Sequence, residues 1–279
     1  MKRILIPTDF SENALNALHY AKTLVKNSPC TFYLLNVFHM NPALLVSEEY
    51  NAELTDAYLR ESENGLAKLL SETEGQNKNS EHHFKTISES NTIVQAINRI
   101  VALEYIDFII MGTTGAKGAI EVFLGSNAVR VIKGVNDCPV LVVPKDYSLK
   151  PPKQIVFSTN FNHEFCKKEL EPLLVLAKLW NAKLKIVQLM QEDFLDDWQK
   201  ANKERIKQLF TGLEHSFHKI NYTSSETDAV RDFVKQSQSD MISLVNHKHN
   251  FFRRFTEENV VKKVSFDSPV PVLILPELV

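Results

Sequence analysis

The stretch from residue 2 to residue 27, KRILIPTDFSENALNALHYAKTLVKN, passes from a strand pattern to a helix pattern within a few residues. Its first six residues, KRILIP, contain a run of four apolar residues after two basic ones and predict a β-strand. Ser11 stands directly before a segment with apolar residues at helical spacing, and its hydroxyl suits a helix N-cap. The spaced apolar residues are Ala14, Leu18, Ala21 and Val25. The stretch therefore predicts a strand followed at once by a helix.

The same order continues through the first half of the chain. Short β-rich runs such as 31–38 and 107–112 alternate with helical segments, the longest from about residue 44 to residue 70. Alternation of this kind predicts parallel strands joined by right-handed helical crossovers. Residues 1–147 are therefore predicted to form a Rossmann-like α/β domain, with a five-stranded parallel sheet and helices on both faces.

The second half repeats this pattern with little sequence between the elements. Five strand patterns and four helix patterns recur between residue 152 and residue 279, beginning with KQIVFS at Lys153. The first of these helices is predicted at 164–180 and the last at 258–265. The segment between the halves, KDYSLKPP (145–152), is short, polar and ends in two prolines, as expected of a domain linker. The sequence predicts two tandem domains, 1–147 and 152–279.

Composition limits the classes of function. The 279 residues carry a net charge of −2, which argues against a broad basic surface for nucleic acid. The apolar runs have the length of strands, whereas a membrane span needs about 20 residues, and the N-terminus lacks the apolar core of a secretory signal. Cys30, Cys138 and Cys166 show no metal-ligand spacing and are predicted to be reduced, mostly buried thiols. We expect a cytoplasmic protein that does not cross a membrane.

Half of the eight glycines lie in one segment, GTTGAKGAIEVFLGSN (112–127). The spacing G-x2-G-x9-G-S places Ser126 at the N-cap of a predicted helix, whose free N–H groups attract an anion. It matches neither the P-loop nor the dinucleotide fingerprint. Isolated glycines often only form turns, but the spacing, the helix cap and the position after a strand together favour a phosphate site.

Ligands of parallel α/β sheets bind beyond the carboxyl ends of the strands, where the strand order reverses. That edge is predicted to carry the residues after the first, second and fourth strands: Pro7-Thr8-Asp9, Val37-Phe38-His39 and the glycine segment. Asp9 can accept a hydrogen bond from an exocyclic amine or a ribose hydroxyl, or it can cap the first helix. Both roles stay open at this point, with ligand contact favoured.

The first half resembles a universal stress protein domain of the adenine-nucleotide-binding type, over residues 1 to about 145. The resemblance rests on ILIPTDFSENALNALHYA, LLNVFH, the glycine segment and CPVLVVP. It implies that Asp9 and the backbone of Val37 contact adenine, and that the glycine segment holds ribose and phosphates. The predicted ligand-contacting residues are Pro7, Thr8, Asp9, Val37, Met111, Gly112, Gly115, Gly125, Ser126 and Asn127. The predicted ligand is ATP or AMP, with Mg²⁺ as a candidate companion.

This chain departs from the family pattern at Ala116, where a basic residue is common, although Lys117 follows. This departure implies a weaker contact with a third phosphate. The second half departs further. Asn160 stands where the first half has Asp9, and we align Asn246 with Gly112, His249 with Gly115 and Glu257-Glu258 with Gly125-Ser126. Two carboxylates at a helix N-terminus repel phosphate. The second domain is therefore predicted to have lost the nucleotide, and the glycines are interpreted as a need of the ligand, not of the fold.

The segment HKHNFFRRF (247–255) replaces the glycine motif in the second half. Its interleaved basic and aromatic residues suit base stacking and phosphate contacts. His247 and His249 alternatively offer two metal ligands, which would need more from elsewhere. A solvated loop with its Phe side chains packed down is the favoured interpretation.

The sequence as a whole favours an adenine-nucleotide-binding regulatory protein of the stress response, with no catalytic or metal site. Two alternatives stay open: a slow ATPase or autophosphorylating protein that uses Ser126, and a nucleotide-independent interaction scaffold. The resemblance also implies pairing of the two last strands, CPVLVVP and VPVLILP, as an internal pseudo-dimer. A homodimer is a further expectation about assembly.

Overall fold

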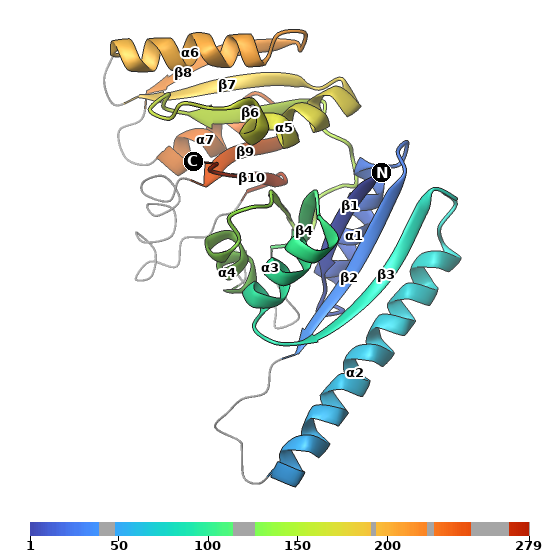
Figure 1. Cartoon of the computed structure of the whole chain (residues 1–279). Helices are drawn as coiled ribbons and strands as arrows, with labels where there is room; N and C mark the ends of the chain where they lie inside the picture. The colour runs from blue at the N-terminus through green and yellow to red at the C-terminus, as the bar shows by residue number, and fades with distance from the viewer. Residues whose placement is uncertain (39–47, 114–125, 191–193, 222–225, 247–267, 279) are drawn as a thin grey trace. The chain divides into compact units, whose positions relative to one another are not determined.

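The computed structural model describes residues 1–38, 48–113, 126–190, 194–221, 226–246 and 268–278 (Figure 1). The chain divides into two compact units, Met1–Lys145 and Asp146–Val279, which are called unit 1 and unit 2 below.

Unit 1 contains a parallel sheet with the strand order β3-β2-β1-β4-β5. Its strands are β1 (Lys2–Pro7), β2 (Cys30–Phe38), β3 (His82–Ser90), β4 (Phe108–Gly112) and β5 (Val140–Val143). Its helices are α1 (Glu12–Leu24), α2 (Glu48–Gly75), α3 (Ile93–Glu104) and α4 (Ser126–Gly134). The chain order reverses between β1 and β4, so the carboxyl ends of these two central strands mark the place where such sheets bind ligands.

Unit 2 contains a parallel sheet with the strand order β10-β9-β6-β7-β8. Its strands are β6 (Gln154–Thr159), β7 (Lys183–Met190), β8 (His215–Asn221), β9 (Met241–Asn246) and β10 (Val272–Pro276). Its helices are α5 (Lys167–Trp180), α6 (Asp197–Leu209) and α7 (Glu226–Gln236). The predicted fold of two tandem Rossmann-like halves, each with a five-stranded parallel sheet, is confirmed. The helix predicted at 258–265 lies outside the described residues.

Unit 1 forms as its sequence pattern indicates. Ile4, Leu5 and Ile6 of β1 are at most 1% exposed, as expected of a central parallel strand covered on both faces. Ser11 caps α1, because its side chain accepts a hydrogen bond from the amide of Ala14. The buried face of α1 includes Ala14, Ala17 and Ala21, whose small side chains allow the helix to lie close to the sheet.

Unit 2 departs from the prediction at α5, which begins at Lys167 and not at Glu164. Two features keep the preceding residues out of the helix. The ring of Phe165 is buried and packs on Phe157 at 5.5 Å between ring centroids. The amide of Cys166 donates a hydrogen bond of 3.4 Å to the carboxylate of Glu169. Because Glu169 lies in the first turn of α5, this bond caps the N-terminus of the helix.

All three cysteines are free thiols, with Cys30 and Cys138 buried. Burial, together with the charge of Asp107, raises the pKa of Cys30 to about 12 and raises the pKa of Cys138 as well. Both thiols are therefore protonated at neutral pH, as expected of structural cysteines. A search of the described helices found none that is both long enough and apolar enough to cross a bilayer.

Candidate functional site

A tight turn, Thr8–Ser11, leaves the carboxyl end of β1 in unit 1. The amide of Thr8 donates to the carbonyl of Leu35 at 2.8 Å, and the side-chain amide of Asn36 donates to the carbonyl of Thr8 at 2.7 Å. Within the turn, the amide of Phe10 donates to Thr8 Oγ1 at 3.0 Å, and Phe10 adopts the left-handed region with φ of 62°. The turn is thus held firmly to the end of β2.

Asp9 is exposed at this edge, and its carboxylate supports the start of α1. Asp9 Oδ1 accepts hydrogen bonds from the amide of Ser11 at 3.2 Å and from its hydroxyl at 2.6 Å. The same hydroxyl accepts the bond from Ala14 that caps the helix. Of the two roles considered for Asp9, capping therefore belongs to Ser11, which Asp9 orients, and ligand contact by Asp9 stays a prediction.

Unit 2 repeats this turn at Thr159–Asn162. The amide of Phe161 donates to Thr159 Oγ1 at 3.0 Å, and φ of Phe161 is 61°. The amide of Asn162 donates to Asn160 Oδ1 at 3.0 Å, as Ser11 does to Asp9. The turn therefore needs only a side-chain oxygen at its second position. The negative charge of Asp9 is a property of unit 1 that the turn itself does not require.

Gly112, at the carboxyl end of β4, has a packing role. The register of β1 with β4 pairs Leu5 with Ile109, and its continuation places Thr8 opposite Gly112. A Cβ atom on Gly112 would lie 2.5 Å from Asn13 Nδ2 and 2.9 Å from the carbonyl oxygen of Asn13. Helix α1 thus packs directly on this glycine. The interpretation that the fold does not need the glycines is wrong for Gly112.

The structure also corrects the alignment of the two halves at this point. Asp107 and Asp240 make the same bond before β4 and β9, accepting from the amides of Arg3 and Gln154. From those anchors, Gly112 pairs with Val143 of β5 and Val245 pairs with Leu275 of β10. Val245, and not Asn246, therefore corresponds to Gly112, and Asn246 corresponds to Thr113.

The first helix of unit 2 also begins later than that of unit 1, and this accompanies the replacement of Gly112 by Val245. Helix α1 begins four residues after Thr8, at Glu12, whereas α5 begins eight residues after Thr159, at Lys167. The helix turn that packs on Gly112 in unit 1 consequently has no helical counterpart at Val245.

Thr113 is a candidate site residue that the sequence interpretation missed. Its amide donates to the carbonyl of Val143 at 3.1 Å, and the residue is 6% exposed. Within the described part of the chain, its hydroxyl has no hydrogen-bond partner. Leaving a buried polar group without a hydrogen bond lowers the stability of the fold by about 1–3 kcal/mol. Such a hydroxyl at the carboxyl end of the central strand β4 therefore suits contact with a ligand. Its position directly after a strand-ending glycine was the available signal.

The other predicted ligand-contacting residues fall at or near the same edge. Pro7 and Met111 have buried side chains at the ends of β1 and β4, and Val37 is half-buried near the end of β2. Asn127 is exposed in the first turn of α4, which Ser126 begins. Gly115 and Gly125 lie outside the described residues, as does the segment 247–255. The ligand contacts of all these residues stay predictions.

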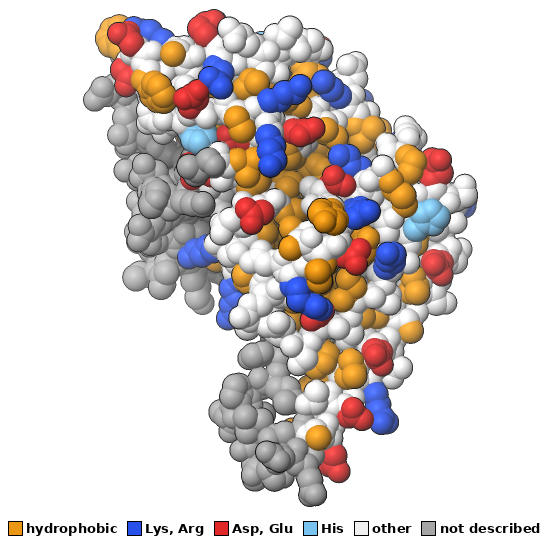
Figure 2. Space-filling model, viewed as in Figure 1, with side chains coloured by type: hydrophobic (Ala, Val, Ile, Leu, Met, Phe, Trp, Pro, Cys, Tyr) orange, Lys and Arg blue, Asp and Glu red, His pale blue; other side chains and the backbone are white. Residues whose placement is uncertain are grey.

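Charged side chains of both signs share the face of the molecule that Figure 2 shows. On the face shown in Figure 2, acidic and basic side chains lie interspersed. Among the described residues no group of three or more His, Cys, Asp or Glu side chains is placed to hold a metal ion. The Mg²⁺ expected with ATP stays a prediction.

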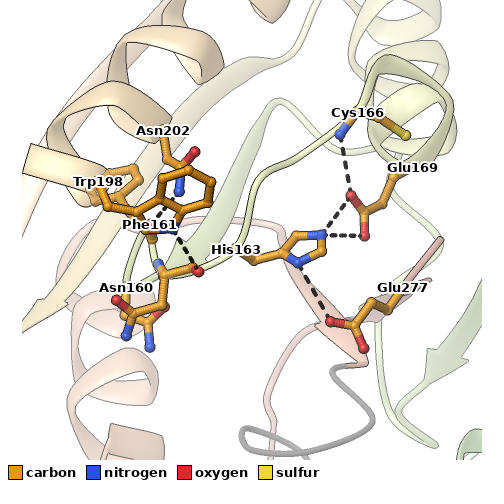
Figure 3. A network of polar contacts seen from close by, with 9 residues as sticks. Asn160, Phe161, His163, Cys166, Glu169, Trp198, Asn202 and Glu277 are labelled. Carbon is orange, nitrogen blue, oxygen red and sulfur yellow. Dashed lines mark hydrogen bonds and ion pairs between the residues drawn. The ribbon is translucent and has the colours of Figure 1, made fainter. Parts of the chain in front are cut away.

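A second polar cluster, the His163 cluster, lies just after the turn of unit 2 and consists of His163, Glu169 and Glu277 (Figure 3). His163 Nε2 lies 2.9 Å from Glu169 Oε1, and His163 Nδ1 lies 3.5 Å from Glu277 Oε1. Glu169 is fully buried in the first turn of α5. The imidazole therefore joins α5 to the residue that follows β10, a link that sequence patterns did not reveal.

The protonation of His163 depends on these carboxylates. Burial by itself lowers the pKa of His163, but the hydrogen bond and the charge of Glu169 oppose it. The charges of Glu277 and Glu164 add to the effect, and the net pKa of His163 is raised above 6.5. Glu164 is itself paired with Arg205. The imidazolium form is thus favoured in the folded chain.

Raising the pH is expected to remove the stability that His163 provides. A group whose pKa is raised on folding contributes fully below its unfolded pKa, and the contribution is lost as the pH rises through the folded value. The difference in free energy of unfolding between wild type and His163→Gln should therefore shrink from about pH 6 to about pH 9. Urea unfolding across this range measures it, with His83→Gln, at an exposed histidine, as control. A difference that stays constant or grows with pH contradicts this role.

The chain is similar in sequence to proteins of a known family. The model of the universal stress protein family matches residues 1–144. A universal stress protein of Methanocaldococcus jannaschii is 34% identical over 145 residues, which are 52% of this chain and 82% of that protein. A second one from the same organism is 31% identical over 165 residues, covering 53% of this chain and 97% of that protein.

The fold of the whole chain also has a solved counterpart. The crystal structure of a universal stress protein from Archaeoglobus fulgidus covers 99% of this chain and 96% of its own, with a TM-score of 0.70 and 18% identity. At this identity the likeness shows the fold alone. The family match to residues 1–144, which make up unit 1 with its turn and its glycine-ended central strand, shows that the chain belongs to the universal stress protein family.

Proposed function

We propose that unit 1 binds one adenine nucleotide, ATP or AMP, at the carboxyl ends of β1 and β4, and that its occupancy regulates contacts with partners in a stress response. The observation that carries the proposal is that two features occur together at the place where the strand order reverses. The charged turn at Asp9 and the buried hydroxyl of Thr113, which has no partner among the described residues, follow the two central strands of the unit that matches the family.

The residues present fit a nucleotide. Asp9 supplies an acceptor for the exocyclic amine of adenine or a ribose hydroxyl, and the backbone near Val37 supplies further contacts. Thr113 Oγ1 offers a donor that has no partner among the described residues. The first turn of α4, with Asn127 exposed in it, presents free N–H groups to phosphate oxygens. A polyphosphate would thus meet the positive end of a helix dipole.

Unit 2 is proposed to act as a structural or partner-binding half that holds no nucleotide. Three differences support this. Asn160 replaces the charge of Asp9, Val245 replaces Gly112, and hydrogen bonds from α6 already occupy the carbonyl oxygens of the turn at Asn160, Phe161 and Asn162. Because these carbonyl oxygens already accept hydrogen bonds, this edge of the sheet offers fewer acceptors to a ligand.

The substitution Asp9→Asn tests the role of the charge without disturbing the turn, because Asn160 makes the same turn bond in unit 2. A hydrogen bond to a charged group contributes about 1.5–3 kcal/mol, so affinity for ATP and AMP should fall about tenfold or more. Titration calorimetry on the full chain measures it. Glu12→Gln, an exposed carboxylate in the first turn of α1, is the matched control and should leave the affinity unchanged.

Two results would contradict the proposal. One is a wild-type chain that gives neither heat nor a thermal shift with any adenine nucleotide. The other is an Asp9→Asn variant that binds as tightly as wild type, which would remove Asp9 from the site.

A further inference from the structure

Phe10 takes an unusual backbone conformation for a residue with a large side chain. Its φ of 62° lies in the left-handed region, and 42% of its surface is exposed. The ring rests on Gly65 in the middle of α2. A Cβ atom on Gly65 would lie 2.5 Å from Cζ of the ring and 2.6 Å from Cε2. The ring therefore occupies the space that any other side chain at residue 65 would take.

The face of α2 around Gly65 is the face that covers the sheet. Ser62, Leu66, Leu69 and Thr73 are buried, at the spacing of one helical stripe, and Gly65 lies beside them. Glycine in a helix interior is unfavourable, so its presence in this stripe calls for a packing reason. The ring of Phe10 supplies that reason.

In unit 2 the matching turn is held to its covering helix in another way. Phe161 has the same backbone conformation but is fully buried. Trp198 Nε1 donates to the carbonyl of Asn162 at 3.3 Å, and Asn202 Nδ2 donates to the carbonyl of Phe161 at 2.9 Å (Figure 3). Gln199 Nε2 donates to the carbonyl of Asn160 at 3.0 Å. Both units thus attach the turn to the helix that follows their second strand, unit 2 with polar bonds to α6 and unit 1 with an aromatic ring on α2.

The backbone at Phe10 is hydrogen-bonded to the side chains of the two residues that precede it. The amide of Phe10 bonds to Thr8 Oγ1, and the amide of the following residue bonds to Asp9 Oδ1. These bonds require the left-handed conformation at Phe10, which L-residues adopt only when their surroundings hold them there. Loss of the contact with Gly65 would free the turn to relax, and both side chains would lose their orientation.

We propose that Phe10 is a positioning residue for the nucleotide site: its ring, resting on Gly65 of α2, holds Thr8 and Asp9 in the orientation that ligand binding needs. The proposal rests on the proposed function of unit 1. It assigns Phe10 a role that needs no contact with the ligand, and it links the long helix α2 to the site through one contact.

The variant Gly65→Leu tests this by displacing the ring. Gly75→Leu is the matched control, because a Cβ atom at Gly75 of the same helix has no neighbour within 4 Å. Phe10→Ala removes the ring itself and serves as the second variant if Gly65→Leu does not fold. Two quantities are measured on the full chain: amide hydrogen exchange of Phe10 and Ser11 without ligand, and the dissociation constant of ATP by calorimetry.

In Gly65→Leu and in Phe10→Ala, both amides should exchange about tenfold faster or more, and ATP should bind about tenfold more weakly with unchanged stoichiometry. Gly75→Leu should match wild type in both. A purely structural role would lower the melting temperature and leave the dissociation constant of the folded protein unchanged.

Two results would overturn the proposal while leaving the proposed function intact: exchange rates that do not change, or faster exchange with unchanged affinity. A wild-type chain that binds neither ATP nor AMP contradicts the proposed function itself and removes the positioning role with it. The exchange rates then still show whether the ring holds the turn, so the two failures are distinguishable.

Discussion

The substitution Gly112→Val is expected to lower the free energy of unfolding of unit 1 by about 3 kcal/mol, the upper range for overpacking of a core. The space beside Gly112 is filled by Asn13, and one of the contacting atoms is the backbone carbonyl oxygen, 2.9 Å from where a Cβ would lie. A backbone atom cannot swing aside as a side chain can. The first turn of α1 would have to move away from β4, taking the Ser11 cap and the Asp9 turn with it.

Denaturant unfolding followed by circular dichroism measures this effect. Gly75→Val is the control, because its site is open, and it should change the stability by less than about 0.5 kcal/mol. Gly134→Ala is unsuitable as a control because its Cβ would meet a methyl group of Val94 at 2.5 Å. If Gly112→Val is as stable as the control, α1 does not pack tightly on β4 at this glycine.

Glu169→Ala should destabilise unit 2 by about 3 kcal/mol, the lower range for removal of one partner from a buried ion pair. The carboxylate of Glu169 is fully buried and bonds both to His163 and to the amide of Cys166. Its loss leaves a half-buried imidazole with Glu277 as its remaining partner in the His163 cluster and opens the start of α5.

Glu171→Ala, two residues along the same helix and exposed, is the matched control and should cost less than about 0.5 kcal/mol. Unfolding near neutral pH, where His163 is still charged in part, gives the comparison. Equal stabilities of the two variants would mean that the buried carboxylate contributes nothing to the fold.

The fold was predictable because it follows from local patterns. Apolar strand runs such as β1, helical spacing in α1 and the cap at Ser11 are all present in short segments of sequence. The alignment of Asn246 with Gly112 was off by one residue because strand patterns do not reveal register, which depends on the distant bonds of Asp107 and Asp240. The start of α5 was misplaced for a similar reason, since it depends on buried Phe165 and Glu169.

The candidate site was predictable to the extent that topology determines it. Residues that follow strands of a parallel sheet share one edge, so Thr8, Asp9 and Val37 could be named from the strand order alone. Thr113 and the packing of Gly112 on Asn13 were missed, because both depend on what neighbouring elements bring to that edge. His163 gave no signal either, because its partner Glu277 lies in the last residues of the chain.

The stoichiometry of ATP binding to the full chain tests the central claim most directly. If unit 1 holds the nucleotide and unit 2 has lost it, calorimetry of the wild type should give one molecule of ATP per chain, and Gly125→Asp, which places a carboxylate in the predicted phosphate segment, should abolish the heat. Two molecules per chain, no binding at all, or one molecule that survives Gly125→Asp would contradict the account.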